Sequence, residues 1–117
     1  MKSKKMNLLK NDIIIAQNIQ KADSFIKRTV GLLNKKSLTL EEGLLFEKCN
    51  SIHSFGMKFD FDAIYLDNDN KVVGLIENIK PNRIMPIVFK AKKVLETTSG
   101  FVQKHNIQIG DKITFQQ

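Results

Sequence analysis

The sequence predicts an α+β fold, a β-rich single domain with a strongly curved sheet or small barrel of short, mostly antiparallel strands. Three observations predict it. Short runs of β-branched and aromatic residues alternate with turn residues, only two segments suggest helices, and 117 residues suffice for one core but not for two. We expect one main helix over residues 23–34 and one short helix over residues 100–105.

The N-terminal part predicts a tail followed by a hairpin. Residues 1–6 are basic and are expected to be flexible, so the single domain is expected to span residues 7–117. Asn7–Leu9 and Ile13–Asn18 predict two paired strands, because the residues between them, Lys10–Asp12, form turns readily. The next segment changes period: Ile26, Val30 and Leu33 lie four and three residues apart, which is typical of one face of a helix.

The middle of the chain predicts strands again. Leu44–Phe46 reads as a short buried strand, and Phe55, Met57, Phe59 and Phe61 occupy alternate positions, which predicts a half-buried strand from Ser54 to Leu66. Asp67–Asn70 is a turn sequence, so Lys71–Ile76 is expected to return as the partner strand.

The C-terminal part begins with an irregular connection, Asn78–Pro86, which holds both prolines. Lys93–Thr97 then predicts a strand. The short helix is expected to start after Ser99–Gly100 and to end where Asn106 adopts a positive φ, before a last strand at Ile113–Phe115.

Composition limits the cellular setting. The chain lacks the ~20 consecutive apolar residues of a membrane-spanning helix, and Lys10–Asp12 interrupt the apolar stretch that a secretory signal requires. A single cysteine allows no internal disulfide, so we expect a cytoplasmic protein. The formal charge of +7 could attract anions, but the lysines are scattered along the sequence, which favours solvated surface over a nucleic-acid footprint.

Two alternatives concern the segment Cys49–Asp62. Cys49, His53 and Met57 are soft ligands that could hold copper or zinc, and Cys49 with His53 could form a thiolate and its base. The simpler interpretation is that Met57 belongs to the core and Cys49 is a small buried hydrophobe.

Four ionisable residues lie in or beside predicted strands, where burial requires a partner: His53, Asp62, Arg83 and Glu96. The guanidinium of Arg83 could pair with the carboxylate of Asp62 or Glu96 as a structural ion pair. Alternatively, the four side chains could line a polar pocket for a ligand. The sequence leaves both possibilities open.

Four blocks together resemble the uncharacterised family UPF0127, also called domain of unknown function 192 (DUF192). They are Arg28–Leu33, Gly43–Phe46, Cys49–Asp67, and Val94–Glu96 with Gly100 and Gly110–Asp111. The positions that correspond to marked positions of the third block are Cys49, Ser51, His53, Met57, Phe59, Asp62 and Asp67. Asp60 stands in place of a proline, Asn82 in place of an aromatic residue and Leu33 in place of a methionine. The resemblance implies a compact β-rich domain and no established activity.

We therefore expect a non-enzymatic binding module without a cofactor. Its pocket would present His53, Asp62, Arg83 and Glu96 to a small polar ligand or a peptide end. The alternatives are soft-metal binding through Cys49, His53 and Met57, a thiol enzyme using Cys49 and His53, and weak nonspecific nucleic-acid binding through the lysines.

Overall fold

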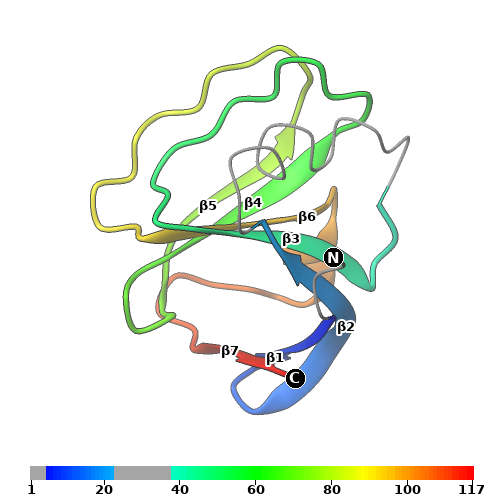
Figure 1. The fold of residues 1–117 in the computed structure, drawn as a ribbon, viewed down its shortest axis with the longest axis vertical. Coiled ribbons are helices and arrows are strands. Elements are labelled where there is room, and N and C mark those ends of the chain that lie inside the picture. The colour runs from blue at the N-terminus through cyan, green and yellow to red at the C-terminus, as the bar shows by residue number, and fades with distance from the viewer. Residues whose placement is uncertain (1–4, 23–37) are drawn as a thin grey trace.

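The computed structural model describes residues 5–22 and 38–117, which form one strongly curled, half-barrel sheet (Figure 1). The strands are β1 (Met6–Lys10), β2 (Ile13–Lys21), β3 (Glu42–Glu47), β4 (Phe61–Leu66), β5 (Val72–Ile79), β6 (Lys93–Thr98) and β7 (Ile113–Gln116), with a short helix, α2 (Phe101–Lys104), between β6 and β7. The β-rich fold is thus confirmed. The predicted main helix over residues 23–34 lies outside the described residues.

The sheet is mixed, with the strand order β5-β4-β6-β3-β2-β1-β7. Neighbouring strands are antiparallel except for β2 and β3, which run parallel. The curl brings the two edges of the sheet together at one end, where the Val72 amide donates to the Asp111 carbonyl at 2.9 Å and the Ile113 amide donates to the Asn70 carbonyl at 2.9 Å. The predicted curvature of the sheet is therefore real.

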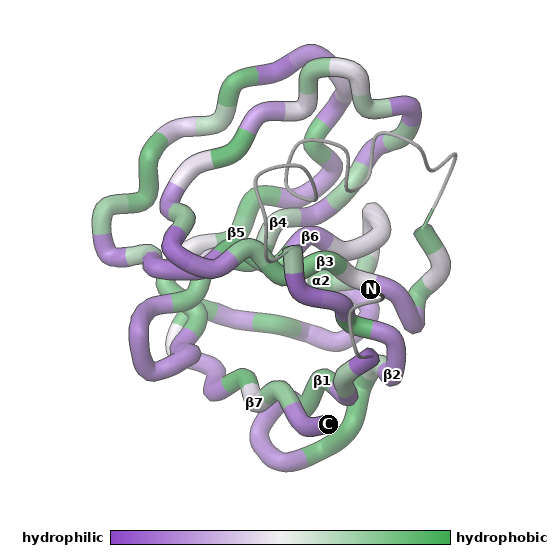
Figure 2. Tube along the Cα trace, viewed as in Figure 1, coloured by the Kyte–Doolittle hydropathy of each residue, from purple (hydrophilic) through white to green (hydrophobic). Residues whose placement is uncertain are grey.

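Each face of the sheet carries a hydrophobic cluster, and Figure 2 shows how apolar residues gather along the strands. The first cluster takes residues from all seven strands and from α2, among them Leu8, Ile19, Ile64 and Phe101. The second cluster lies on the opposite face of the β4–β6 region and includes Tyr65 and Val94. Burial of both faces explains why every residue of β4 is buried and why its sequence shows no polar alternation.

Two long connections cover the second cluster. Residues 48–60 follow β3, residues 80–92 follow β5, and they run side by side as the two arches at the top and left of Figure 1. Backbone hydrogen bonds join them, including Cys49 N to Lys92 O at 2.9 Å and Met85 N to Ile52 O at 3.0 Å. We call these two segments the ribbon. Their inward side chains, such as Ile52 and Val88, pack onto the second cluster.

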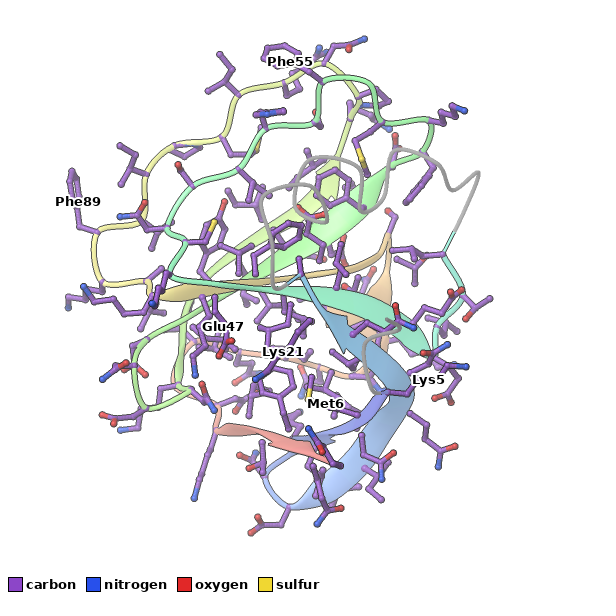
Figure 3. The ribbon with its side chains drawn as sticks, viewed as in Figure 1. Lys5, Met6, Lys21, Glu47, Phe55 and Phe89 are labelled. Atoms are coloured by element: carbon purple, nitrogen blue, oxygen red, sulfur yellow. The ribbon has the colours of Figure 1, made fainter. Side chains whose placement is uncertain are left out.

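The ribbon corrects one sequence prediction, because the strand expected from Ser54 begins only at Phe61. Gly56 has a φ of 79°, and the Met57 amide donates to the Ser54 carbonyl at 3.1 Å, so the chain turns here. Met57 is 9% exposed, but Phe55 is 47% exposed and lies at the edge of the molecule (Figure 3). The aromatic alternation therefore spans a turn instead of a single strand.

Most other local predictions are confirmed. The first hairpin and the β4–β5 hairpin form as expected, and the Asp67 carboxylate accepts the amides of Asp69 and Lys71, both at 2.9 Å, which stabilises the second turn. The short helix ends before Asn106, which has a φ of 49°. β1 begins at Met6, a residue that the sequence placed in the N-terminal tail.

Candidate functional site

Asp62 is completely buried and is held by backbone amides. Its Oδ1 accepts the amide of Asn78 at 2.9 Å, and its Oδ2 accepts the amides of Gly100 at 3.1 Å and Val102 at 3.0 Å. The amides of Gly100 and Val102 belong to the start of α2, which has no capping side chain of its own. Hydrogen bonds to the Asp62 carboxylate thus link β5 and α2 to β4. Because the side chain is completely buried, a ligand has no access to it.

The structure does not bring Asp62, Glu96 and Arg83 together. In the β4–β6 register Asp62 lies opposite Thr97 and Glu96 lies opposite Ala63, so the two carboxylates point to different faces of the sheet. Arg83 is exposed on the ribbon, where its Nη1 donates to the carbonyls of Pro81 and Asn82, both at 3.4 Å. No salt bridge joins these three side chains, all of which belong to the described part of the chain.

Glu96 lies on the face of the second cluster and is only 5% exposed. Within residues 5–22 and 38–117 no hydrogen bond to its carboxylate is found, and burial raises its pKa to about 8. On the same face, the Tyr65 hydroxyl is buried and has no hydrogen-bond partner in the described segments. Burial, followed by the charges of Cys49 and Glu96, raises the pKa of Tyr65 to about 12.

Of the residues proposed for the metal site and the thiol–base pair, His53 is exposed, whereas Cys49 and Met57 both pack in the second cluster. His53 is exposed on the ribbon, where its Nδ1 accepts the Phe55 amide at 3.3 Å. Its ring centroid lies 5.1 Å from that of Phe55, and the two rings are tilted by 34°. The Cys49 thiol donates to the Ser51 carbonyl at 3.1 Å, and Met57 packs in the second cluster. Among the residues whose positions are described, no three His, Cys, Asp or Glu side chains are grouped to hold a metal ion.

A surface groove of about 610 Å³ lies at the base of the ribbon. It is lined by the end of β3 and the residues after it, the β4–β5 turn, and the start of β6: Glu47, Lys48, Cys49, Asn50, Asn68, Ala91, Lys92 and Lys93. The volume falls in the range of ~300–1,000 Å³ that small-molecule sites occupy. The described residues therefore form an open groove whose lining comes from three separate segments.

The groove carries an excess of positive charge. Lys48 and Lys92 are exposed, and Lys93 Nζ donates to Asn70 Oδ1 at 2.6 Å. The single carboxylate of the lining, Glu47, forms a salt bridge of 3.5 Å with Lys21 (Figure 3). An anion is thus the ligand that this lining favours electrostatically.

Lys90, Lys92 and Lys93 are close together in the sequence, whereas Lys48 and Cys49 are far from them. The pairing of Cys49 with Lys92 across the ribbon brings these positions together. Because this pairing joins residues more than forty positions apart, no local pattern could reveal it. The close spacing of Lys92 and Lys93 was the one signal available.

The fold and the groove define the class of protein, a small domain with a half-barrel sheet and a cationic surface groove. The chain belongs to the DUF192 family, described as "Uncharacterized ACR", whose model matches residues 8–115. Curated relatives bear the same family name. The chain is 37% identical over 95 residues to UPF0127 protein PH1112 of Pyrococcus horikoshii, covering 79% of this chain and 82% of that protein. It is 35% identical over 98 residues to UPF0127 protein PYRAB11210 of Pyrococcus abyssi, covering 81% and 83% respectively.

Two crystal structures share the fold. One, from Sinorhizobium meliloti and described as a "putative transcription regulator", gives a TM-score of 0.81 at 17% identity and covers 98% of this chain and 96% of its own. The other, a protein of unknown function from Novosphingobium aromaticivorans, gives a TM-score of 0.79 at 20% identity and covers 94% and 83% respectively. In the described residues of the present chain, no helix has the length and apolarity needed to cross a membrane.

Proposed function

We propose that this protein is a binding module for a small anionic ligand, held in the groove at the base of the ribbon. The observation that carries the proposal is the groove lining, where Lys48, Lys92 and Lys93 oppose a single carboxylate that already pairs with Lys21. A phosphate or a carboxylate, including the terminal carboxylate of a peptide, has the charge that such a lining attracts.

Neutral hydrogen-bonding groups in the lining add to the proposal. Asn50 and Asn68 are exposed and come from two different segments of the lining, and their side-chain amides can both donate to and accept from a ligand. A few polar groups placed around a concave surface give orientation and specificity to a bound molecule. The expected polar pocket is thus proposed at this groove, with residues different from those that the sequence suggested.

Cys49 supplies a reporter for the test. It is the single cysteine of the chain and lines the groove, so its alkylation by iodoacetamide should slow when the groove is occupied. We expect pyrophosphate, citrate or a short peptide with a free C-terminus to protect Cys49, and the same peptide with an amidated C-terminus to protect it less. These probes separate phosphate from carboxylate recognition.

A lysine pair provides the mutational arm. The double variant Lys92→Gln/Lys93→Gln should weaken protection by about ten-fold or more, since each cationic contact to an anion contributes on the order of 1 kcal/mol. Lys112→Gln, on an exposed lysine outside the groove, is the matched control and should leave protection unchanged. Absence of protection by every anion, or equal protection in both variants, would refute the groove as an anion site.

A further inference from the structure

The ribbon exposes large apolar side chains outward. Ile84 is 74% exposed, Ile87 is 53% exposed and Phe89 is 84% exposed. On the paired segment, Phe55 is 47% exposed. Figure 3 places Phe55 and Phe89 at the outer edge of the molecule, pointing away from the sheet. Within the described residues, half of the strongly exposed large hydrophobics therefore belong to these two connections; the others are Ile13, Ile14, Leu40 and Ile109.

The same ribbon concentrates positive charge. Residues 48–60 and 80–92 contain six cations and one carboxylate: Lys48, Lys58, Lys80, Arg83, Lys90 and Lys92 against Asp60. Asp60 in turn pairs with Lys80 at 2.5 Å. The ribbon thus holds a net charge of +5, six minus one, out of +7 for the whole chain. Lysines that are scattered in sequence come together because the two connections pair.

Charge and apolar surface are interleaved. Arg83 precedes Ile84, and Lys90 follows Phe89, so each of the most exposed apolar side chains has a cation beside it in the chain. This arrangement suits a boundary at which apolar groups leave water while neighbouring cations meet anionic groups. A bilayer surface that contains anionic lipids has both components, acyl chains below a layer of negative headgroups.

We propose that the ribbon docks the protein onto an anionic lipid surface. Phe89, Ile84 and Ile87 enter the headgroup and acyl boundary, and Arg83 and Lys90 bind lipid phosphates and carboxylates. A single-stranded nucleic acid is a poorer fit, because base stacking uses aromatic rings, and two of the three exposed apolar side chains on residues 80–92, Ile84 and Ile87, are aliphatic. This inference uses the outer ribbon and does not depend on an anion in the groove.

Vesicle co-sedimentation tests the proposal. The protein should bind vesicles of phosphatidylcholine with phosphatidylserine, bind pure phosphatidylcholine vesicles much more weakly, and release from the anionic vesicles as sodium chloride is added. Ile84→Ser/Phe89→Ser should weaken binding at least ten-fold. Arg83→Gln/Lys90→Gln should weaken it by about ten-fold or more, since each cation near an anionic surface is worth about a five-fold change.

Matched controls lie elsewhere on the surface. Ile109 is 63% exposed and lies between α2 and β7, so Ile109→Ser removes a comparable apolar group without touching the ribbon, and Lys112→Gln removes a comparable cation. Both controls should bind vesicles like the unaltered protein. All substituted side chains are exposed, and an unchanged far-ultraviolet circular dichroism spectrum will confirm that each variant folds.

Three results would overturn the proposal. The first is no binding to anionic vesicles, and the second is equal loss of binding in the ribbon and control variants. The third is a protein that does not bind vesicles but binds single-stranded oligonucleotides, which would assign the ribbon to nucleic acid. A change in the sedimentation coefficient of the protein alone, without vesicle binding, would assign the ribbon to self-association. Protection of Cys49 by small anions is measured separately, so failure of one proposal is distinguishable from failure of the other.

Discussion

Replacing Glu96 by glutamine should stabilise the protein at neutral and alkaline pH. The folded structure raises the pKa of Glu96 from 4.5 to about 8 through burial, so the folded state keeps its proton where the unfolded chain has lost it. Between these two values the free energy of unfolding falls as pH rises. One pKa unit corresponds to about 1.4 kcal/mol. The cost of keeping Glu96 buried therefore lowers the free energy of unfolding by about 3 kcal/mol at pH 7 and by roughly 5 kcal/mol above pH 8.

Glutamine imitates the neutral carboxyl group and does not titrate. The difference in the free energy of unfolding between Glu96→Gln and the unaltered protein should therefore be near zero at pH 4.5, grow in favour of the variant through pH 7, and level off above pH 8. Urea denaturation followed by circular dichroism at several pH values measures it. Taking the difference between the two proteins cancels every other titrating group. A difference that does not change with pH, or a less stable variant at pH 8.5, would refute the reasoning.

Three further perturbations test other features. Asp62→Asn should destabilise the protein by about 2–4 kcal/mol in urea denaturation, opposite in sign to Glu96→Gln, because one amide oxygen cannot accept the three amides of Asn78, Gly100 and Val102. Gly43→Ala should lower the melting temperature, because the added Cβ would lie 2.8 Å from Ile19 Cδ1 and 3.1 Å from the Glu96 carbonyl oxygen. Such a clash costs roughly 1–3 kcal/mol, and an unchanged melting temperature would contradict this packing. Burial and the charges of Lys104 and Lys10, opposed by Glu41, lower the pKa of His105 below 6.5, so the free energy of unfolding should fall as the pH drops below 6.5. His105→Gln should remove this decrease. An equal decrease in the variant would assign the effect to another group.

Local chemistry was sufficient to predict most of the strands and turns. The turn residues Lys10–Asp12 and Asp67–Asn70 lie between strands that pair as expected, and Asn106 adopts the positive φ that ends the short helix. These features depend on residues close together in the chain, and backbone preferences of single residues decide them. The family was predicted on different grounds, from the resemblance of four sequence blocks, and the family model matches residues 8–115.

The candidate site needed the tertiary structure. The sequence identified Asp62 and Glu96 as unusual, but only the β4–β6 register shows that one carboxylate accepts three backbone amides and the other lies on the opposite face. A one-residue difference in register would exchange those faces, and the sequence of a strand buried on both sides carries no alternation to fix it.

Short-range conformational preferences and hydrophobic spacing were enough to predict a curved β-rich domain and most of its turns, and the resemblance of four sequence blocks was enough to predict its family. The tertiary structure decided where charge and apolar surface gather. Pairing of the connections after β3 and β5 places Lys48 beside Lys92 and leaves Ile84 and Phe89 facing outward. Such contacts join residues tens of positions apart, so they depend on how the whole chain closes and not on any segment alone.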